Sequence, residues 1–366
     1  MERTGQPEKI EQRKIDIHDP MLKALRLMDA IEKKLLLVFD GGKFAGLVSI
    51  GDIQRAIIGN HPLDTPVQKI LRPNIRLAHQ GDDFDHIRQE MIRERAECMP
   101  ILDADGNLDD VIFWEDIFPG GEKRLERKLN FPVVIMAGGK GVRMKPFTNI
   151  LPKPLIPIDE KTIMEHIMDR FVEIGCHDFL VSVNHKADFI RFYFDNLAHP
   201  AYSISYFQEE KPLGTAGSLF LQKDHIRSTF FVTNCDILID QDYGEIVDYH
   251  QEQNNELTLV AALKHIRIPY GTIETAEGGQ LTALQEKPEL MFKINSGFYI
   301  LEPHLLKEIP DREFFNITDL IEKIMKRNGK VGVFPVSSNS WTDIGEWSEY
   351  IRASKKISNE NFADGK

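Results

Sequence analysis

The chain has few cysteines, no long apolar segment and no excess of basic charge, and each absence excludes a class of protein. Its three cysteines, Cys98, Cys176 and Cys235, are far apart and match no metal-binding spacing. So sparse and odd a set predicts a reducing compartment. No apolar run is long enough to span a bilayer, and residues 1–14 are polar and charged, unlike a signal peptide. We therefore expect a cytoplasmic protein.

The charge balance excludes two kinds of partner. A net charge of -12 over 366 residues argues against a protein that coats nucleic acid or an anionic membrane. Hydrophobic residues at 42% and charged residues at 28% are ordinary for a globular protein, and the length favours two or three domains. Basic residues are concentrated locally, as an anionic substrate requires. We therefore expect a small anionic substrate, no nucleic acid and no membrane.

A strand followed by a glycine-rich loop is the most informative stretch. The apolar run at 133–136 predicts a buried strand that leads through Ala137 into the loop. The loop carries glycines and cations at Gly138, Gly139, Lys140, Gly141, Arg143 and Lys145. Glycine lets backbone N–H groups approach an anion, so a strand feeding such a loop suits phosphate binding. The spacing matches neither the ATPase phosphate loop nor the dinucleotide fingerprint, and on the loop alone an ordinary glycine turn is an equal alternative.

A lysine between two prolines, Lys153, follows in the segment 151–157, and the prolines stiffen the backbone around it. Loop and segment together resemble the signature of the sugar-1-phosphate nucleotidyltransferases, G-G-x-G-T-R-L-x-P-L-T followed by P-K-P. The matching positions are Gly138, Gly139, Gly141, Arg143, Pro146, Thr148, Lys153 and Pro154. Val142 and Met144 stand where the family usually has threonine and leucine, so Val142 is not counted as a ligand.

The resemblance extends to the base pocket. The segment 211–218 contains the family's L-G-T-A-G, which would shape the base and sugar pocket. Glu209, just upstream, would accept hydrogen bonds from guanine; the alternative is a solvated surface glutamate. The nucleotide-binding residues that the resemblance implies are Ala137, Gly138, Gly139, Gly141, Arg143, Glu209, Gly214 and Thr215.

Two aspartates are implied as magnesium ligands. Asp236 ends a predicted strand where the family usually has N-G-D, and Asp343 lies in a W-x-D-x-G segment. Magnesium takes one or two carboxylates together with substrate phosphates. Either aspartate alone could cap a helix, but the resemblance implies that the two hold Mg²⁺.

The sugar phosphate would be bound further along the chain. Glu286 and Lys287 match the family's E-K-P, and Asn295 matches N-[AS]-G. The sugar-phosphate-binding residues implied are Gly271, Glu286, Lys287 and Asn295. The sugar phosphate would attack the α-phosphorus of a nucleoside triphosphate and expel pyrophosphate. The implied catalytic residues are Arg143, Lys153, Asp236 and Lys287.

The N-terminal third contains an internal repeat, residues 16–71 and 72–120. Each copy predicts a helix, then two strands joined by a glycine turn, then a helix that opens at an aspartate. This order resembles a tandem pair of CBS domains, which commonly bind adenosine nucleotides. Ser49 and Asp52 match the family's ribose motif, whereas Phe113 breaks it in the second copy, which implies one bound adenosine nucleotide. An equal alternative is that Asp52 caps its helix.

We thus expect an α/β chain with a loose N-terminal extension at 1–15, CBS copies at 16–71 and 72–120, a linker at 121–130 and a nucleotidyltransferase domain at 131–366. Alternating strands and helices predict a Rossmann-like, doubly wound sheet, and closely spaced strands between 257 and 300 add an antiparallel part, so that the sheet is mixed. Ligands would bind beyond the carboxyl ends of its strands.

The combination of a CBS pair with this domain is similar to the glucosamine-1-phosphate guanylyltransferases of bacterial legionaminic acid synthesis, which serves cell-surface polysaccharide. The resemblance implies GTP and glucosamine 1-phosphate as substrates, GDP-glucosamine as product, regulation by the CBS pair and a homo-oligomer. The alternatives are a mannose-, heptose- or glucose-1-phosphate nucleotidyltransferase, or a non-catalytic sensor of sugar nucleotides. Arg143, Lys153, Asp236 and Asp343 are all present, which disfavours the sensor.

Overall fold

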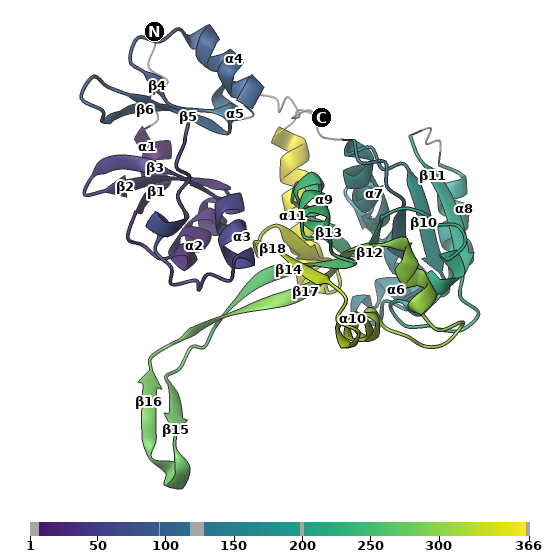
Figure 1. Cartoon of the computed structure of the whole chain (residues 1–366). Helices are drawn as coiled ribbons and strands as arrows, with labels where there is room; N and C mark the ends of the chain where they lie inside the picture. The colour runs from purple at the N-terminus through teal and green to yellow at the C-terminus, as the bar shows by residue number, and fades with distance from the viewer. Residues whose placement is uncertain (1–6, 95, 118–127, 198–200, 364–366) are drawn as a thin grey trace. The chain divides into compact units, whose positions relative to one another are not determined.

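The chain divides into two compact units, Met1–Leu125 and Glu126–Lys366 (Figure 1). The computed structural model describes residues 7–94, 96–117, 128–197 and 201–363. Most of the predicted linker at 121–130 lies outside the described residues. Over the described part of the chain, no helix has the length and apolar character that crossing a membrane requires.

The first unit is built twice on one plan, which confirms the predicted repeat of elements. The first copy consists of β1 (Lys14–Asp16), α2 (Met21–Ile31), β2 (Leu35–Asp40), β3 (Lys43–Ser49) and α3 (Ile50–Ile58). The second consists of β4 (Ala78–His79), α4 (Phe84–Glu94), β5 (Cys98–Leu102), β6 (Leu108–Phe113) and α5 (Trp114–Ile117). In each copy the first strand pairs parallel with the second, and the second antiparallel with the third. That the copies are CBS domains stays a prediction.

The described residues of the N-terminal extension, 7–15, form regular structure, so the expectation of a loose start was wrong for them. Residues Pro7–Gln12 form helix α1, and β1 follows. The guanidinium of Arg13 is buried 3.9 Å from the ring centre of Phe113, and its Nη2 donates to Glu115 at 2.8 Å. Lys9 pairs with Asp116 at 2.5 Å. Acidic groups of the second copy thus neutralise Lys9 and Arg13 and hold this segment in place.

The second unit contains a seven-stranded sheet with the order β11-β10-β7-β12-β17-β14-β18. Its strands are β7 (Val133–Met136), β10 (Asp178–Val183), β11 (Ser203–Gln208), β12 (Phe230–Asn234), β14 (Leu257–Arg267), β17 (Glu289–Leu301) and β18 (Val331–Val336). Strand β17 runs antiparallel to both neighbours, and the other pairs are parallel, so the sheet is mixed as predicted. The order reverses at β7, which has β10 on one side and β12 on the other; such a switch point is where open α/β sheets bind ligands.

Both faces of this sheet are covered. The helices are α6 (Phe147–Ile150), α7 (Ile163–Glu173), α8 (Ala187–Asp195), α9 (Tyr243–Glu252), α10 (Ile317–Lys326) and α11 (Trp347–Ala363), with 3-10 helices that include η4 (Gly217–Gln222) and η6 (Pro303–Glu308). On one face Phe231 of β12 packs with Phe171 of α7 and Tyr243 of α9. Its neighbours Phe230 and Val232 belong to a core cluster with residues of η4, η6 and α10. Because successive strand residues point to opposite faces, the sheet is doubly wound as predicted.

Strands β14 and β17 continue past the sheet as a two-stranded arm. Their ladder runs on from Ala261–Asn295 to Arg267–Glu289, whereas β14 pairs with β18 only as far as Ala262. A hairpin of β15 (Thr272–Thr275) and β16 (Leu281–Gln285) forms the tip. Figure 1 shows the tip, with β15 and β16, far from the sheet and pointing away from β12.

Candidate active site

Two aspartates lie side by side because two short strands pair. Strands β13 (Ile237–Ile239) and β19 (Trp341–Asp343) are antiparallel, with Ile237 opposite Asp343. The N–H of Ile344 donates to the carbonyl of Asp236 at 2.8 Å. Asp236 follows the end of β12, so this pairing brings Asp343 to the carboxyl-end side of the sheet, next to the switch point.

The two carboxylates differ in their surroundings. The ammonium of Lys153 is in direct contact with Oδ2 of Asp236, and both residues are buried. Oδ1 of Asp343 is buried and has no hydrogen-bond partner among the described residues. Burial raises the pKa of Asp343, and the neighbouring charge of Asp236 raises it further. An unsatisfied buried oxygen costs free energy until a donor or a cation reaches it, and two adjacent carboxylates suit a hard cation such as Mg²⁺.

The loop after β7 closes onto the segment that carries Lys153. Gly141 has φ 60°, and a Cβ there would lie 2.9 Å from Cγ2 of Thr148 and 3.1 Å from Cβ of Lys153. The hydroxyl of Thr148 donates to the carbonyl of Gly141 at 2.9 Å. Only glycine therefore fits this position, and the close approach holds the loop beside the buried lysine.

Arg143 completes the group. Its Nη1 lies 3.9 Å from Oδ2 of Asp343 and 3.4 Å from Oε1 of Glu346, and its side chain is 56% exposed. The structure thus brings together the four predicted residues Arg143, Lys153, Asp236 and Asp343. Glu346, only three positions after Asp343, was not predicted; the second carboxylate in that segment was the available signal.

Glu209 is buried, so the alternative of a solvated surface glutamate was wrong. Its Oε1 accepts from the hydroxyl of Ser182 at 2.9 Å and its Oε2 from the N–H of Leu213 at 3.1 Å. A Cβ on Gly138 would lie 3.3 Å from the same Oε1. The carboxylate therefore lies against the glycine loop and anchors the segment at 213, while its contact with guanine stays a prediction.

Asn184 was missed by the sequence argument. It directly follows β10, and its buried Nδ2 has no partner among the described residues. Its Cβ would lie 3.2 Å from a Cβ on Gly138. A polar residue at the end of a strand beside β7 was the signal that could have identified it.

The L-G-T-A-G segment packs against the N-terminus of α10. A Cβ on Gly214, whose φ is 80°, would lie 2.7 Å from the carbonyl oxygen of Phe315. The hydroxyl of Thr215 accepts from the N–H of Ile317 at 2.9 Å. Both residues thus have a structural role, and their nucleotide contacts stay a prediction, as do those of Ala137 and Gly139.

The predicted sugar-phosphate residues are separated. Asn295 lies at the root of the arm, where its Oδ1 accepts from the N–H of Gly297 at 3.2 Å. The strand from Asn295 out to Glu289 is about 20 Å long at the usual rise per residue. Glu286, Lys287 and Gly271 lie beyond that point, and among the described residues Lys287 forms an ion pair with Glu286 alone, at 4.0 Å. The structure does not bring these three residues to the aspartates of their own chain.

In the first unit, Asp52 is a helix cap, as one alternative predicted. Ser49 and Asp52 form a reciprocal capping box at the start of α3. The Asp52 carboxylate also contacts Arg55 and accepts from Nε of Arg72 at 2.6 Å. Burial alone would raise its pKa, but hydrogen bonds from Arg72 and Ser49 hold that pKa below its ordinary value. Binding of a nucleotide at Ser49 and Asp52 stays a prediction.

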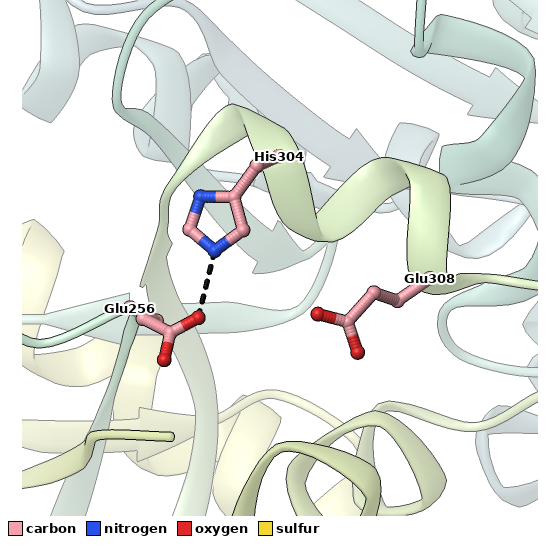
Figure 2. A group of neighbouring side chains, drawn as sticks. All are labelled: Glu256, His304 and Glu308. Atoms are coloured by element: carbon pink, nitrogen blue, oxygen red, sulfur yellow. Dashed lines mark hydrogen bonds and ion pairs between the residues drawn. The ribbon is translucent and has the colours of Figure 1, made fainter. Parts of the chain in front are cut away.

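A second group of side chains that could bind a metal lies near the start of β14 and in η6; it consists of Glu256, His304 and Glu308 (Figure 2). Arg327 already neutralises it: Nη1 donates to Glu256 at 3.0 Å and Nη2 to Glu308 at 2.7 Å. The bonds from Arg327 lower the pKa of Glu256 to about 2. Because a guanidinium occupies the position a cation would take, we assign an ion-pair network that joins β14, η6 and the end of α10.

Comparison with known proteins gives a family. The family model described as "Nucleotidyl transferase" matches residues 132–360. A UTP–glucose-1-phosphate uridylyltransferase from Synechocystis sp. is 30% identical over 244 residues, covering 61% of this chain and 62% of that protein. The mannose-1-phosphate guanylyltransferase catalytic subunit beta of Xenopus tropicalis is 31% identical over 225 residues, covering 60% and 62%. The chain thus spans less than two thirds of the length of these relatives.

A solved structure has the same fold as the second unit. The crystal structure of HddC from Yersinia pseudotuberculosis is 25% identical, with a TM-score of 0.50, and covers 62% of this chain and 99% of that one. The family model therefore falls on the unit that holds Arg143, Lys153, Asp236 and Asp343.

Proposed function

Because the chain belongs to the nucleotidyl transferase family, we propose that it transfers a nucleotidyl group from a nucleoside triphosphate to a sugar 1-phosphate and releases pyrophosphate. The observation that carries this proposal is the juxtaposition of Arg143, Lys153, Asp236 and Asp343 beside the glycine loop at the switch point. Two cations and two carboxylates suit this reaction, because the sugar phosphate, the reacting α-phosphate and the leaving pyrophosphate are all anionic and must be held together.

The reaction needs no nucleophile from the protein. A phosphate oxygen of the sugar forms a bond with the α-phosphorus while the bond from that phosphorus to the leaving pyrophosphate breaks. Cys235, next to Asp236, is unsuited to attack, because burial raises the pKa of its thiol to about 12. The work of the chain is positioning and charge neutralisation.

Each cation has a place in this scheme. The exposed guanidinium of Arg143 binds the phosphates that leave as pyrophosphate and balances the charge that develops on them. Lys153 is held between prolines and against Asp236, so its ammonium stays at the α-phosphate end of the site. We assign to Lys287 the alignment of the attacking sugar phosphate; because it lies on the arm, it must reach the site from another chain.

We further propose that Asp236 and Asp343 hold Mg²⁺. The partnerless buried oxygen of Asp343 supports this assignment. When bound, the ion would neutralise charge on the reacting phosphate. Asp236 and Asp343 themselves set its place: Asp343 belongs to the β13–β19 ladder, and the carbonyl of Asp236 accepts from the N–H of Ile344.

For the substrates we propose GTP and glucosamine 1-phosphate, with GDP-glucosamine as product. Relatives that are guanylyltransferases support guanine, and the pairing with a CBS-like repeat supports the hexosamine and a role in legionaminic acid and surface polysaccharide synthesis. A uridylyltransferase among the relatives makes UTP with glucose 1-phosphate the first competitor. Mannose and heptose 1-phosphates are the other acceptors to compare.

One experiment tests the whole proposal. Purified protein is offered each of four nucleoside triphosphates with glucosamine, mannose, heptose and glucose 1-phosphates, with Mg²⁺, and pyrophosphate release is followed. The highest kcat/KM is expected for GTP with glucosamine 1-phosphate. If a folded protein releases no pyrophosphate with any pair but binds sugar nucleotides in calorimetry, it is a sensor and the catalytic proposal is wrong.

A further inference from the structure

The arm of the second unit is unusually apolar for a solvent-exposed ribbon. Its exposed large side chains are Ile266, Tyr270, Ile273, Leu281, Leu284, Leu290 and Phe292. Ile266 is paired with Leu290 and Ile273 with Leu284, so each pair forms a continuous apolar patch on one face. A two-stranded ribbon is marginally stable in water by itself, and apolar side chains exposed along both of its strands indicate a contact surface.

The root of the arm is fixed, so the arm does not swing onto its own site. A Cβ on Gly297 would lie 2.5 Å from Nδ2 of Asn234, which leaves no free space between the root and the end of β12. Nε1 of Trp341 donates to the carbonyl of Ser296 at 3.2 Å. From Asn295 outward the ladder is regular, which carries Lys287 more than about 20 Å away along the strand. A lysine side chain cannot span that distance.

The neighbourhood of the phosphate-binding residues has exposed apolar side chains of its own. Val142 precedes Arg143 and is 60% exposed, and Ile150 at the end of α6 is 73% exposed. Trp347, 47% exposed, stacks on Phe147 with ring centres 5.0 Å apart. We call Val142, Phe147, Ile150 and Trp347 the apolar rim. Among the described residues, the rim and the arm are thus two apolar surfaces left exposed on one chain. Lys287 lies on the arm, away from the site beside the rim.

We propose that the arm of one copy packs on the apolar rim of a second copy and delivers Lys287 to that copy's site. A reciprocal exchange gives a closed two-fold dimer in which each site is completed by its neighbour. The exchange removes both apolar surfaces from water. The role of Lys287 rests on the proposed function, whereas the docking of the arm does not.

Complementation between two inactive variants tests the exchange. Differently tagged full-length Lys287→Ala and Asp236→Asn chains are co-expressed, and the heterodimer is purified through both tags. If Lys287 acts across the dimer, one site in two is complete, and the heterodimer has about half of the wild-type turnover. If Lys287 acts within its own chain, every site lacks one residue, and turnover stays at the level of the two homodimers, which overturns the proposal. The heterodimer of wild type with Asp236→Asn is the control for assembly.

Hydrogen exchange tests the docking without any assay of activity. In the wild-type chain, amides of the arm should be protected at micromolar concentration and lose protection on dilution. The double variant Ile273→Ser, Leu284→Ser should lose it at every concentration, while Met325→Ser, an exposed apolar residue on α10, should not. Arm amides that are unprotected throughout, or that are equally protected in the wild-type chain and in the Ile273→Ser, Leu284→Ser variant, would show that no second copy covers the arm. This experiment tests the docking of the arm even if the protein turns over no substrate pair.

Discussion

At the scale of single residues, the site depends on charges that the fold holds in unfavourable surroundings. Asp343 is the clearest case, since it combines a buried oxygen without a partner with a neighbouring carboxylate. Its raised pKa means that folding disfavours the charged form. Under the proposed function, a bound cation would offset the free energy that this costs.

Asp343→Asn should therefore separate stability from activity. Turnover should fall by about two orders of magnitude or more, because a carboxylate next to the reacting phosphate is lost. Without Mg²⁺ at pH 7, the variant should melt at a higher temperature than wild type. The raised pKa means that only the charged carboxylate destabilises the folded wild type. The difference in melting temperature between variant and wild type should therefore vanish as the pH falls below the ordinary aspartate value of 3.8, where the group is protonated in both the folded and the unfolded chain. Thermal melts from pH 7 to pH 3, with the exposed Asp311→Asn as control, measure both effects.

Gly141 and Gly139 make a matched pair for the loop. Gly141→Ala introduces a Cβ 2.9 Å from Thr148 at a φ of 60°, whereas a Cβ on Gly139 meets nothing within 4 Å. We expect Gly141→Ala to lower the free energy of unfolding by about 1–3 kcal/mol and to raise the KM for the triphosphate. Gly139→Ala should leave the stability unchanged. Equal melting temperatures for the two variants would contradict the proposed close approach.

At the scale of elements, ion pairs join segments that are distant in sequence. Arg327 at the end of α10 binds Glu256 at the start of β14 and Glu308 in η6. Because the pKa of Glu256 is lower in the folded chain, the charged carboxylate stabilises the fold. That contribution is present above the ordinary value of 4.5 and is lost as the pH falls towards about 2.

Glu256→Gln should accordingly destabilise the second unit at pH 7 by about 1–2 kcal/mol, a modest value because the pair is partly exposed. The difference from wild type should shrink between pH 4.5 and about 2. Chemical denaturation at several pH values gives the two free energies. A metal role for Glu256, His304 and Glu308 would instead appear as stabilisation by added Zn²⁺, which we do not expect while Arg327 is in place.

At the scale of the whole molecule, the two units suggest that a ligand of the first regulates the second. We propose that one adenosine nucleotide binds between the two copies of the first unit, near Asp52. The second copy lacks the hydroxyl residue of the motif, since Phe113 stands there, and its Asp116 is paired with Lys9. A nucleotide changes activity only if it binds two arrangements of the chain with different affinity.

Calorimetric titration of AMP, ADP and ATP tests this assignment. Wild type should bind one nucleotide per chain, Asp52→Ala should bind at least about tenfold more weakly, and Asp116→Ala should bind like wild type. Since Asp52 also caps α3, a melting curve must show that the variant is folded. Undiminished binding by folded Asp52→Ala would leave that residue a cap only.

The sequence by itself determined the elements of the second unit and pointed to the residues that we propose bind phosphate. Strand β7, helix α7 and the repeat of the first unit follow from hydrophobic periodicity and turn residues, which act over a few positions. Gly141 and Lys153 were predicted for a similar reason, since a glycine loop and a proline-flanked lysine are local devices. Short sequence patterns are enough to predict a feature when residues close in sequence determine it.

Only the tertiary structure decided which distant groups meet. The β13–β19 pairing places Asp343 beside Asp236, and burial turns Glu209 from a surface residue into an anchor. The same holds for Arg327, which fills a cluster that resembles a metal centre, and for the arm that carries Lys287 away from its own site. Such contacts depend on how strands pair across long stretches of chain. The residues next to a side chain in the sequence do not predict which distant residue it will contact.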